Sequence, residues 1–226
     1  MPRSHAGIAG PASAVVSTQT MNNRLQLLIA SANKGKVAEY RELLDGLECD
    51  LLSVQDAGIS GEVEETGSTY EENARLKAVT CAGRSGLITL ADDSGLEVDA
   101  LGGEPGIRSA RYAGANATDA QRVAYLLAKL KDVPVGQRAA RFVCVIAIAT
   151  PGGEVTFCRG ECPGAIVTQP RGDRGFGYDP AFLLPEMGVT VAELPSETKN
   201  RLSHRGRAAA IARQVLQQFI DGGTTR

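Results

Sequence analysis

Two adjacent aspartates, Asp92 and Asp93, follow directly after an apolar run at residues 86–91. Two carboxylates about 4 Å apart repel each other by roughly 4 kcal/mol at an effective dielectric of 20, so such a pair favours a bound proton or a shared cation. A second acidic group lies upstream and consists of Glu62, Glu64 and Glu65. Oxygen ligands without histidine or cysteine favour Mg²⁺. The alternative is that the aspartates cap a turn and the glutamates are solvated.

A lysine-bearing loop, SANKGK at residues 31–36, lies between an apolar run and a helical pattern. Lys34 and Lys36 flank Gly35, and a helix N-terminus of this kind offers backbone N–H groups and a positive dipole end to an anion. The Walker A pattern is absent, so this is not the loop of a P-loop NTPase. The segment predicts a phosphate site, and an ordinary turn that carries two lysines is the alternative.

Aromatic residues make up only 4% of the chain, yet two of them stand in one glycine-rich segment, GFGYDP at residues 175–180. Phe176 or Tyr178 can offer a ring on which a nucleobase stacks, a contact worth about 1–3 kcal/mol. In the alternative interpretation Phe176 packs inward and Asp179 and Pro180 form a turn.

Three residues that can read a nucleotide, Lys199, His204 and Arg205, lie at the start of the last helical pattern. Histidine can bond to a base edge, and arginine can bind a phosphate or a carbonyl group. The alternative is a helix capped by Ser203 with solvated neighbours. Together with the acidic residues and the lysine loop, these residues predict a site for a Mg²⁺-bound nucleotide, because a triphosphate carries roughly four negative charges.

The composition is that of an ordinary globular domain and disfavours several classes of protein. The 226 residues include 24 Lys+Arg and 26 Asp+Glu, a net charge of -2, which argues against a general nucleic-acid coat protein. Five cysteines without a C-x-x-C motif and only two histidines disfavour a zinc site and fit reduced cysteines in the cytoplasm. Because no apolar run reaches about 18 residues, we expect no membrane helix.

Hydrophobic periodicity predicts the elements that must position these residues. Strands are expected at residues 25–30, 51–54, 87–91, 141–150, 154–158 and 181–184. Helices are expected from 37 to 44, from 69 to 83 or 86, from 118 to 130, and from 203 to 220. The order predicts a mixed α/β fold with parallel units early and a hairpin late. We expect one domain at residues 21–222, preceded by a disordered extension or vector-derived remnant at residues 1–20.

Six segments of the chain, taken together and in this order, resemble the inosine triphosphate pyrophosphatases, also called XTP/dITP diphosphatases. The matching segments are ASANKGKVAEY, EETGSTYEENARLKA, LADDSGLEVDALGGEPGIRSARYAG, RFVCVIAIAT, GFGYDPAFLLP and ETKNRLSHRGRA. They extend from about Leu25 to Ile220. GFGYDP followed by SHRG is quite specific, whereas SANKGK alone is not.

The resemblance implies an enzyme that hydrolyses non-standard purine nucleoside triphosphates, such as ITP, dITP and XTP, to the monophosphate and pyrophosphate with Mg²⁺. It implies an α/β fold of mixed α+β character, in which an elongated mixed sheet is flanked by helices and two lobes enclose a central cleft. A cytoplasmic homodimer without nucleic-acid or membrane partners is expected. The alternatives are a pyrophosphatase for another modified nucleotide and a non-enzymatic nucleotide sensor.

The resemblance also implies roles for individual residues. Asp93 is the expected proton acceptor, Asp92 assists it, and Lys77 lies near the phosphates. Glu64 and Asp93 are the expected metal-associated carboxylates. The expected substrate-binding residues are Ser31, Ala32, Asn33, Lys34, Gly35, Lys36 and Ser94 toward the phosphates, and Phe176, Gly177, Tyr178, Asp179, Lys199, His204 and Arg205 toward the base.

Overall fold

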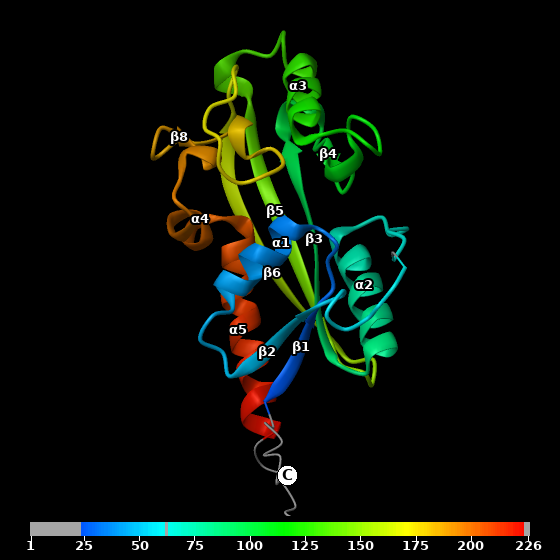
Figure 1. The fold of residues 1–226 in the computed structure, drawn as a ribbon. Coiled ribbons are helices and arrows are strands. Elements are labelled where there is room, and N and C mark those ends of the chain that lie inside the picture. Colours follow the sequence, from blue (N-terminus) through cyan, green and yellow to red (C-terminus); the bar gives the residue numbers. More distant parts are fainter. Residues whose placement is uncertain (1–23, 62, 224–226) are drawn as a thin grey trace, which may run out of the picture.

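The computed structural model describes residues 24–61 and 63–223 (Figure 1). The predictions for residues 1–20 and for Glu62 lie outside this part of the chain. The strands are β1 (Leu25–Ile29), β2 (Cys49–Ser53), β3 (Ile88–Val98), β4 (Pro105–Gly106), β5 (Ala139–Ala149), β6 (Val155–Ile166), β7 (Phe182–Leu184) and β8 (Val189–Thr190). The α-helices are α1 (Lys34–Leu43), α2 (Tyr70–Ser85), α3 (Asp119–Lys129), α4 (Ser196–Leu202) and α5 (His204–Gly223).

One mixed sheet organises the fold, with the strand order β2-β1-β3-β5-β6-β7-β8 and with β4 paired to β3. Strands β2 and β3 run parallel to β1, whereas the pairs from β3 to β8 are antiparallel. Strands β5 and β6 form a hairpin whose register extends from Ala139↔Ala165 to Ala149↔Val155. The predicted order of parallel units followed by a hairpin is therefore confirmed.

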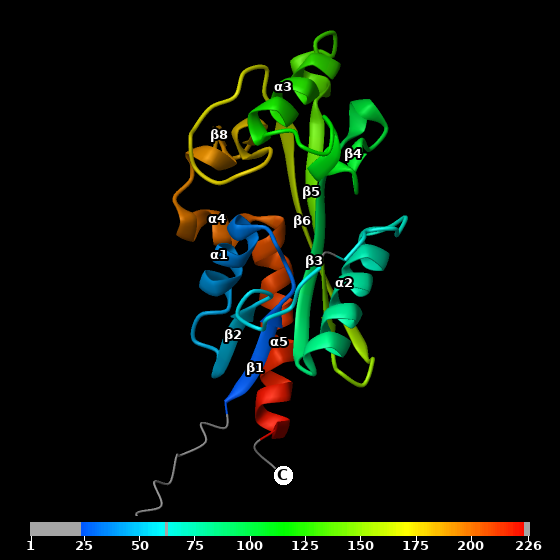
Figure 2. The same ribbon diagram turned by 45° about the vertical axis from the view of Figure 1, so that its right-hand side comes forward.

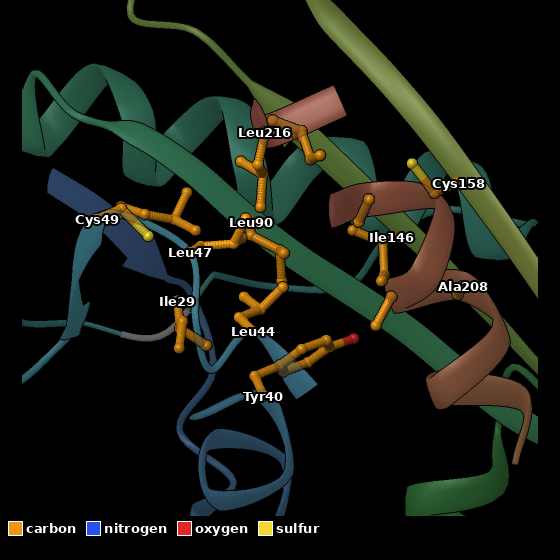
Figure 3. Packing of buried hydrophobic residues seen from close by; sticks show 14 of the residues in the cluster. Ile29, Tyr40, Leu44, Leu47, Cys49, Leu90, Ile146, Cys158, Ala208 and Leu216 are labelled. Atoms are coloured by element: carbon orange, nitrogen blue, oxygen red, sulfur yellow. The ribbon is translucent and has the colours of Figure 1, made fainter. Parts of the chain in front are cut away.

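The core at the β1 end of the sheet has two layers, because successive side chains of a strand point to opposite faces. On one face Ile146 of β5 packs with Tyr40 of α1, with Leu44 at the C-cap of that helix and with Leu216 of α5 (Figure 3). On the other face its neighbour Val145 packs against α2. In Figure 1 α2 accordingly lies on one side of the long strands, and α1 and α5 lie on the other.

A separate core lies at the other end of the sheet. There Leu96 of β3 and Phe142 of β5 pack with Leu126 of α3 and with the segment around β7 and β8. The same two strands contribute Leu90 and Ile146 to the first core, so β3 and β5 run through both lobes (Figure 2). The expected elongated, two-lobed α/β architecture with a mixed sheet is confirmed.

The prediction was wrong about where the strand beside the aspartates ends. Strand β3 continues through Asp92 and Asp93 to Val98, and the two aspartates pair with Ile146 and Val145 of β5. Charged residues can stay inside this strand because cations from three helices contact their carboxylates. Since they are adjacent in a strand, the two carboxylates face opposite sides of the sheet rather than each other.

The sequence also predicted too little structure in the second half. Strand β6 extends eight residues beyond Cys158, to Ile166, although polar residues and glycines interrupt its apolar pattern. Gly160 permits this, because a Cβ there would lie 2.3 Å from the carbonyl oxygen of His204 in α5. The short helix α4 and the two-residue strand β8 were not predicted.

All five cysteines are buried and free. Burial raises the pKa of Cys144 to about 12 and that of Cys158 to about 11, so the reactive thiolate is disfavoured at neutral pH. Across residues 24–61 and 63–223, none of the helices is both long and apolar enough to span a membrane.

Candidate active site

The site lies beside β3, where the sheet is interrupted. Strand β1 pairs with residues 88–90 of β3, and β4 pairs with Leu96 and Glu97. Between them, residues 91–95 have β5 on one side and, in the described part of the chain, no strand on the other. The chain that leaves β1 at this point enters α1, so the interruption brings the N-terminus of a helix next to the two aspartates.

The lysine loop forms the N-terminus of α1. Asn33 is the N-cap, and its side-chain oxygen accepts hydrogen bonds from the N–H groups of Gly35 (2.9 Å) and Lys36 (3.2 Å). Ser31 in turn accepts from the N–H of Asn33 through its hydroxyl group. Of the six residues in the loop, Asn33 and Lys36 line the pocket described below, whereas Ala32 and Lys34 are exposed outside it.

Asp92 lies on the α1 and α5 face of the sheet. Its Oδ2 is 2.9 Å from the Lys36 ammonium and 3.4 Å from the Arg205 guanidinium. Burial by itself raises the pKa of Asp92, but Lys36 and Arg205 together hold it well below its ordinary value. The sequence predicted that the acidic strand and the lysine loop converge, and these distances confirm that geometry.

Asp93 lies on the α2 face. Its Oδ2 accepts a hydrogen bond from the Asn73 amide at 3.1 Å, and its Oδ1 accepts from the N–H of Ser94. The Lys77 ammonium is 3.9 Å away. Burial, assisted by the nearby charge of Glu65, raises the pKa of Asp93 above its ordinary value despite Lys77. A carboxylate with a raised pKa is a better proton acceptor than a free one.

Glu65, rather than Glu64, faces Asp93. The Glu65 carboxylate is 2.6 Å from the Lys77 ammonium and 3.5 Å from the Arg111 guanidinium, and it lines the pocket. Glu64 is exposed and lies outside the pocket lining. In the described residues no group of three or more His, Cys, Asp and Glu side chains is arranged to hold a metal ion. The Glu65 and Asp93 carboxylates are nevertheless of the ligand type that Mg²⁺ takes in proteins, together with waters and substrate phosphates.

Phe176 lies on the other side of the α1 N-terminus. A Cβ on Gly35 would be 2.9 Å from the ring, which shows how closely the ring packs on the loop. The Lys199 ammonium is 4.8 Å and the Arg205 guanidinium is 5.5 Å from the ring centre. Both cations also contact the carboxylate of Glu39 in α1, at 2.6 and 2.7 Å. Glu39 therefore connects the lysine loop helix to the cations of the predicted base site.

The remaining predicted base-site residues surround this group. Asp179 accepts from the N–H of Phe176 at 3.0 Å and is 2.6 Å from Lys199. The Tyr178 hydroxyl donates to the carbonyl of Ser109. The Tyr178 ring is therefore fixed in the lining of the site and is not a free surface on which a base could stack. His204 stacks on Phe142 with ring centres 4.7 Å apart. Burial, together with Arg205 and Lys199, lowers the pKa of His204 well below its ordinary value, which keeps it neutral.

A single cavity joins these groups. Its lining includes Asn33, Lys36, Glu65, Asp93 and Ser94 at one end, and Phe176, Gly177, Tyr178, Asp179, Lys199, His204 and Arg205 at the other. Its volume is about 140 Å³. Small-molecule sites usually start near about 300 Å³, so a nucleotide needs the lining groups to move apart.

Sequence reasoning missed several residues of the site. One is Asn73, which lies four residues before the predicted Lys77 in α2. Both residues contact Asp93, and this spacing could have revealed Asn73 from the sequence. Glu39 follows Lys36 by three residues in α1 and offered a similar signal. Arg111, Asp119 and Arg122 reach the site from loops and helix ends, and no local pattern marks them.

The chain is similar in sequence and in fold to known proteins. A family model described as Ham1 family matches residues 27–215. A dITP/XTP pyrophosphatase of Geobacter sulfurreducens is 52% identical over 84% of this chain and 96% of its own, and one of Exiguobacterium sibiricum is 46% identical over 87% and 99%. The solved structure of a HAM1 protein from Coxiella burnetii superposes with a TM-score of 0.79 at 43% identity, covering 86% of this chain and 99% of its own. With this match in family model, sequence and fold, the chain belongs to the Ham1 family.

Proposed function

We propose that this protein hydrolyses non-standard purine nucleoside triphosphates, of the ITP, dITP and XTP class, to the monophosphate and pyrophosphate. The observation that carries the proposal is the single cavity with Asp93, Glu65 and Lys36 at one end and Phe176, Lys199 and His204 at the other. The charged end suits a polyphosphate, and the aromatic end suits a base. The names of the relatives give the same substrate class.

The chemistry at the charged end follows from the residues there. A water molecule attacks the α-phosphorus, the bond between that phosphorus and the oxygen bridging to the β-phosphate breaks, and pyrophosphate leaves. Asp93 takes the proton of the attacking water. Asn73 orients the Asp93 carboxylate through its 3.1 Å hydrogen bond. Lys36 and Lys77 supply positive charge to the phosphate oxygens.

Mg²⁺ is part of the proposal, with Glu65 and Asp93 as its protein ligands. The resemblance to the family implied Glu64, but the exposed position of Glu64 favours Glu65 in this role. Bound there, Mg²⁺ would supply positive charge to the phosphate oxygens. In this arrangement Lys77, 2.6 Å from Glu65, offers a second positive charge to the same polyphosphate.

The base end selects for a carbonyl group at position six of the purine. Lys199 has three ammonium protons, and its contacts with Glu39 and Asp179 at 2.6 Å leave one for a ligand acceptor. Hypoxanthine and xanthine present a carbonyl acceptor there, whereas adenine presents an amine donor. A hydrogen-bonded site that meets the wrong group can discriminate by up to about 10⁴–10⁵.

A homodimer in the cytoplasm completes the proposal. The five buried, free cysteines fit a reducing compartment such as the cytoplasm. Size-exclusion chromatography with light scattering measures the assembly directly, and a monomer across the micromolar range would remove the dimer from the proposal.

The decisive experiment is a product assay. The protein is incubated with ITP, dITP, XTP, GTP or ATP and Mg²⁺, and pyrophosphate and orthophosphate are measured separately. We expect pyrophosphate and a monophosphate from the first three substrates and not from ATP. GTP also carries a carbonyl at position six, so its rate measures whether the site reads a second position of the base. Orthophosphate as the first product would indicate a γ-phosphatase. Binding without turnover would indicate a nucleotide sensor, and preference for another modified base would indicate a related pyrophosphatase.

A further inference from the structure

The loop that carries Phe176 is held from outside the catalytic end by Asp119. Asp119 is the first residue of α3, and its Oδ2 accepts a hydrogen bond from the N–H of Gly177 at 2.7 Å. Gly177 adjoins Phe176 and is 58 residues away from Asp119 in the chain. This contact ties the predicted base platform to a helix of the same lobe, whose core contains both Leu126 of α3 and Tyr178.

Asp119 is itself held firmly in place. Its other carboxylate oxygen, Oδ1, bonds to the Arg122 guanidinium. Arg122 also donates to the carbonyl oxygens of Ala110 (3.0 Å) and Ala117 (2.5 Å). Thr118 and Gln121 form a reciprocal capping box at the same helix end. The acceptor for Gly177 is therefore attached to a braced helix end rather than to a free side chain.

The position of Phe176 depends on few contacts of its loop. The N–H of Phe176 bonds to Asp179 and the N–H of Gly177 bonds to Asp119, so adjacent backbone groups are anchored to different parts of the protein. The ring itself packs against Gly35 and beside Lys199. Without the hydrogen bond between Gly177 and Asp119, the backbone next to Phe176 can shift, and the Phe176 ring can shift with it. The charged end of the cavity does not depend on this bond and should stay unchanged.

We propose that Asp119 is a positioning residue that fixes the Phe176 platform, and so sets affinity for the purine base but not for the polyphosphate. The inference rests on the proposed function. It assigns to Asp119 an effect on substrate binding that acts through Phe176. Asp119 does not need its negative charge for the bond to Gly177, because any carbonyl oxygen at that place can accept it. Asparagine keeps this acceptor but turns an amide N–H₂ toward Arg122, so it should substitute for Asp119 better than alanine does.

The affinity test compares two ligands in wild-type protein, Asp119→Ala and Asp119→Asn. We expect Asp119→Ala to raise KM for ITP about tenfold, the loss typical of one hydrogen bond, with kcat changed less than about threefold. Inhibition by inorganic tripolyphosphate with Mg²⁺, which has no base, should be unchanged. Asp119→Asn should retain most of the affinity for ITP. Asp132→Ala, an exposed aspartate with a side chain 87% accessible, is the matched control and should leave both ligands unaffected.

A second readout is independent of turnover. The chain contains no tryptophan, so Phe176→Trp introduces a single fluorophore at the platform. We expect its emission maximum to shift to longer wavelength when Asp119→Ala is added, and not when Asp132→Ala is added.

Unchanged emission overturns the inference even if the protein proves not to hydrolyse ITP. Equal loss of ITP and tripolyphosphate affinity also overturns it, since that result indicates general damage. If wild-type protein releases no pyrophosphate from ITP while the emission shift occurs, the proposed function fails and the anchoring of the loop stands.

Discussion

The two ends of the cavity are built in different ways. At the phosphate end, Lys36, Asp93 and Lys77 project from a helix N-terminus, a strand and a helix. At the base end, a loop and the helix starts of α4 and α5 bring the residues together through bonds over long sequence separations, such as 166 residues between Arg205 and Glu39. At the phosphate end, helices and a strand hold the charged groups in the fixed geometry that the reaction requires. At the base end, a loop contributes much of the surface that distinguishes one base from another. Substitutions at the first end should therefore change rate, and those at the second should change selectivity or stability.

The largest expected effect belongs to Asp93→Asn. The amide keeps the size of the carboxylate but cannot take the proton, so we expect kcat for ITP to fall by about 10²–10⁴. Pyrophosphate release measures the rate, and thermal unfolding within a few degrees of wild type shows that the fold is intact. Near-full activity would remove Asp93 from the mechanism.

Lys36→Ala should rank second, with kcat/KM reduced about 10²-fold, through a higher KM and a lower kcat. The change removes the cation at the charged end and also leaves buried Asp92 with Arg205 as its remaining close cation. Lys34→Ala serves as the comparison, because Lys34 is exposed and lies outside the pocket lining. Equal losses in the two variants would contradict the geometric distinction and restore the family-based prediction for both lysines.

Substitution of the proposed metal ligand Glu65 should have a smaller effect. Comparison with the same change at Glu64 tests which of the two glutamates binds the metal. Glu65→Gln should raise the Mg²⁺ concentration for half-maximal activity about tenfold or more, whereas Glu64→Gln should leave it near the wild-type value. Titration of pyrophosphate release with MgCl₂ measures both. The reverse order would show that Glu64 is the ligand, as the resemblance to the family implied.

The smallest expected effect is the contribution of His204, at the base end, to the pH dependence of the free energy of unfolding. The pKa of His204 is lowered in the folded state, so between that value and about 6.5 the unfolded chain binds a proton that the folded protein does not. Stability then falls as pH is lowered from about 7.5 to 5.5, by at most about 1.4 kcal/mol per pH unit. His204→Phe keeps a ring against Phe142 and removes this contribution. Denaturant unfolding at several pH values should show a flatter profile for the variant, and parallel profiles would contradict the argument.

Much of the fold could be predicted from the sequence because short local patterns define several of its helices and strands. The apolar run of β1, the cap and glycine that bound α2, and the capping pattern of α3 all occur within a few residues of the element they define. Strand β3 was cut short because two aspartates look like a strand end. They remain in the strand only because Lys36, Arg205, Asn73 and Lys77 compensate them, and those residues are distant in sequence.

The sequence by itself determined the inventory of the site: a pair of carboxylates, a lysine loop that begins a helix, a glycine-flanked aromatic and a late group of cations. Only the tertiary structure decided how these are used. It directed Asp92 and Asp93 to opposite faces of one strand, brought Glu65 instead of Glu64 to Lys77, and connected Gly177 to Asp119. The physical reason is that the face of a strand and the partner of a loop depend on register and packing between distant segments, and neighbouring residues do not encode these.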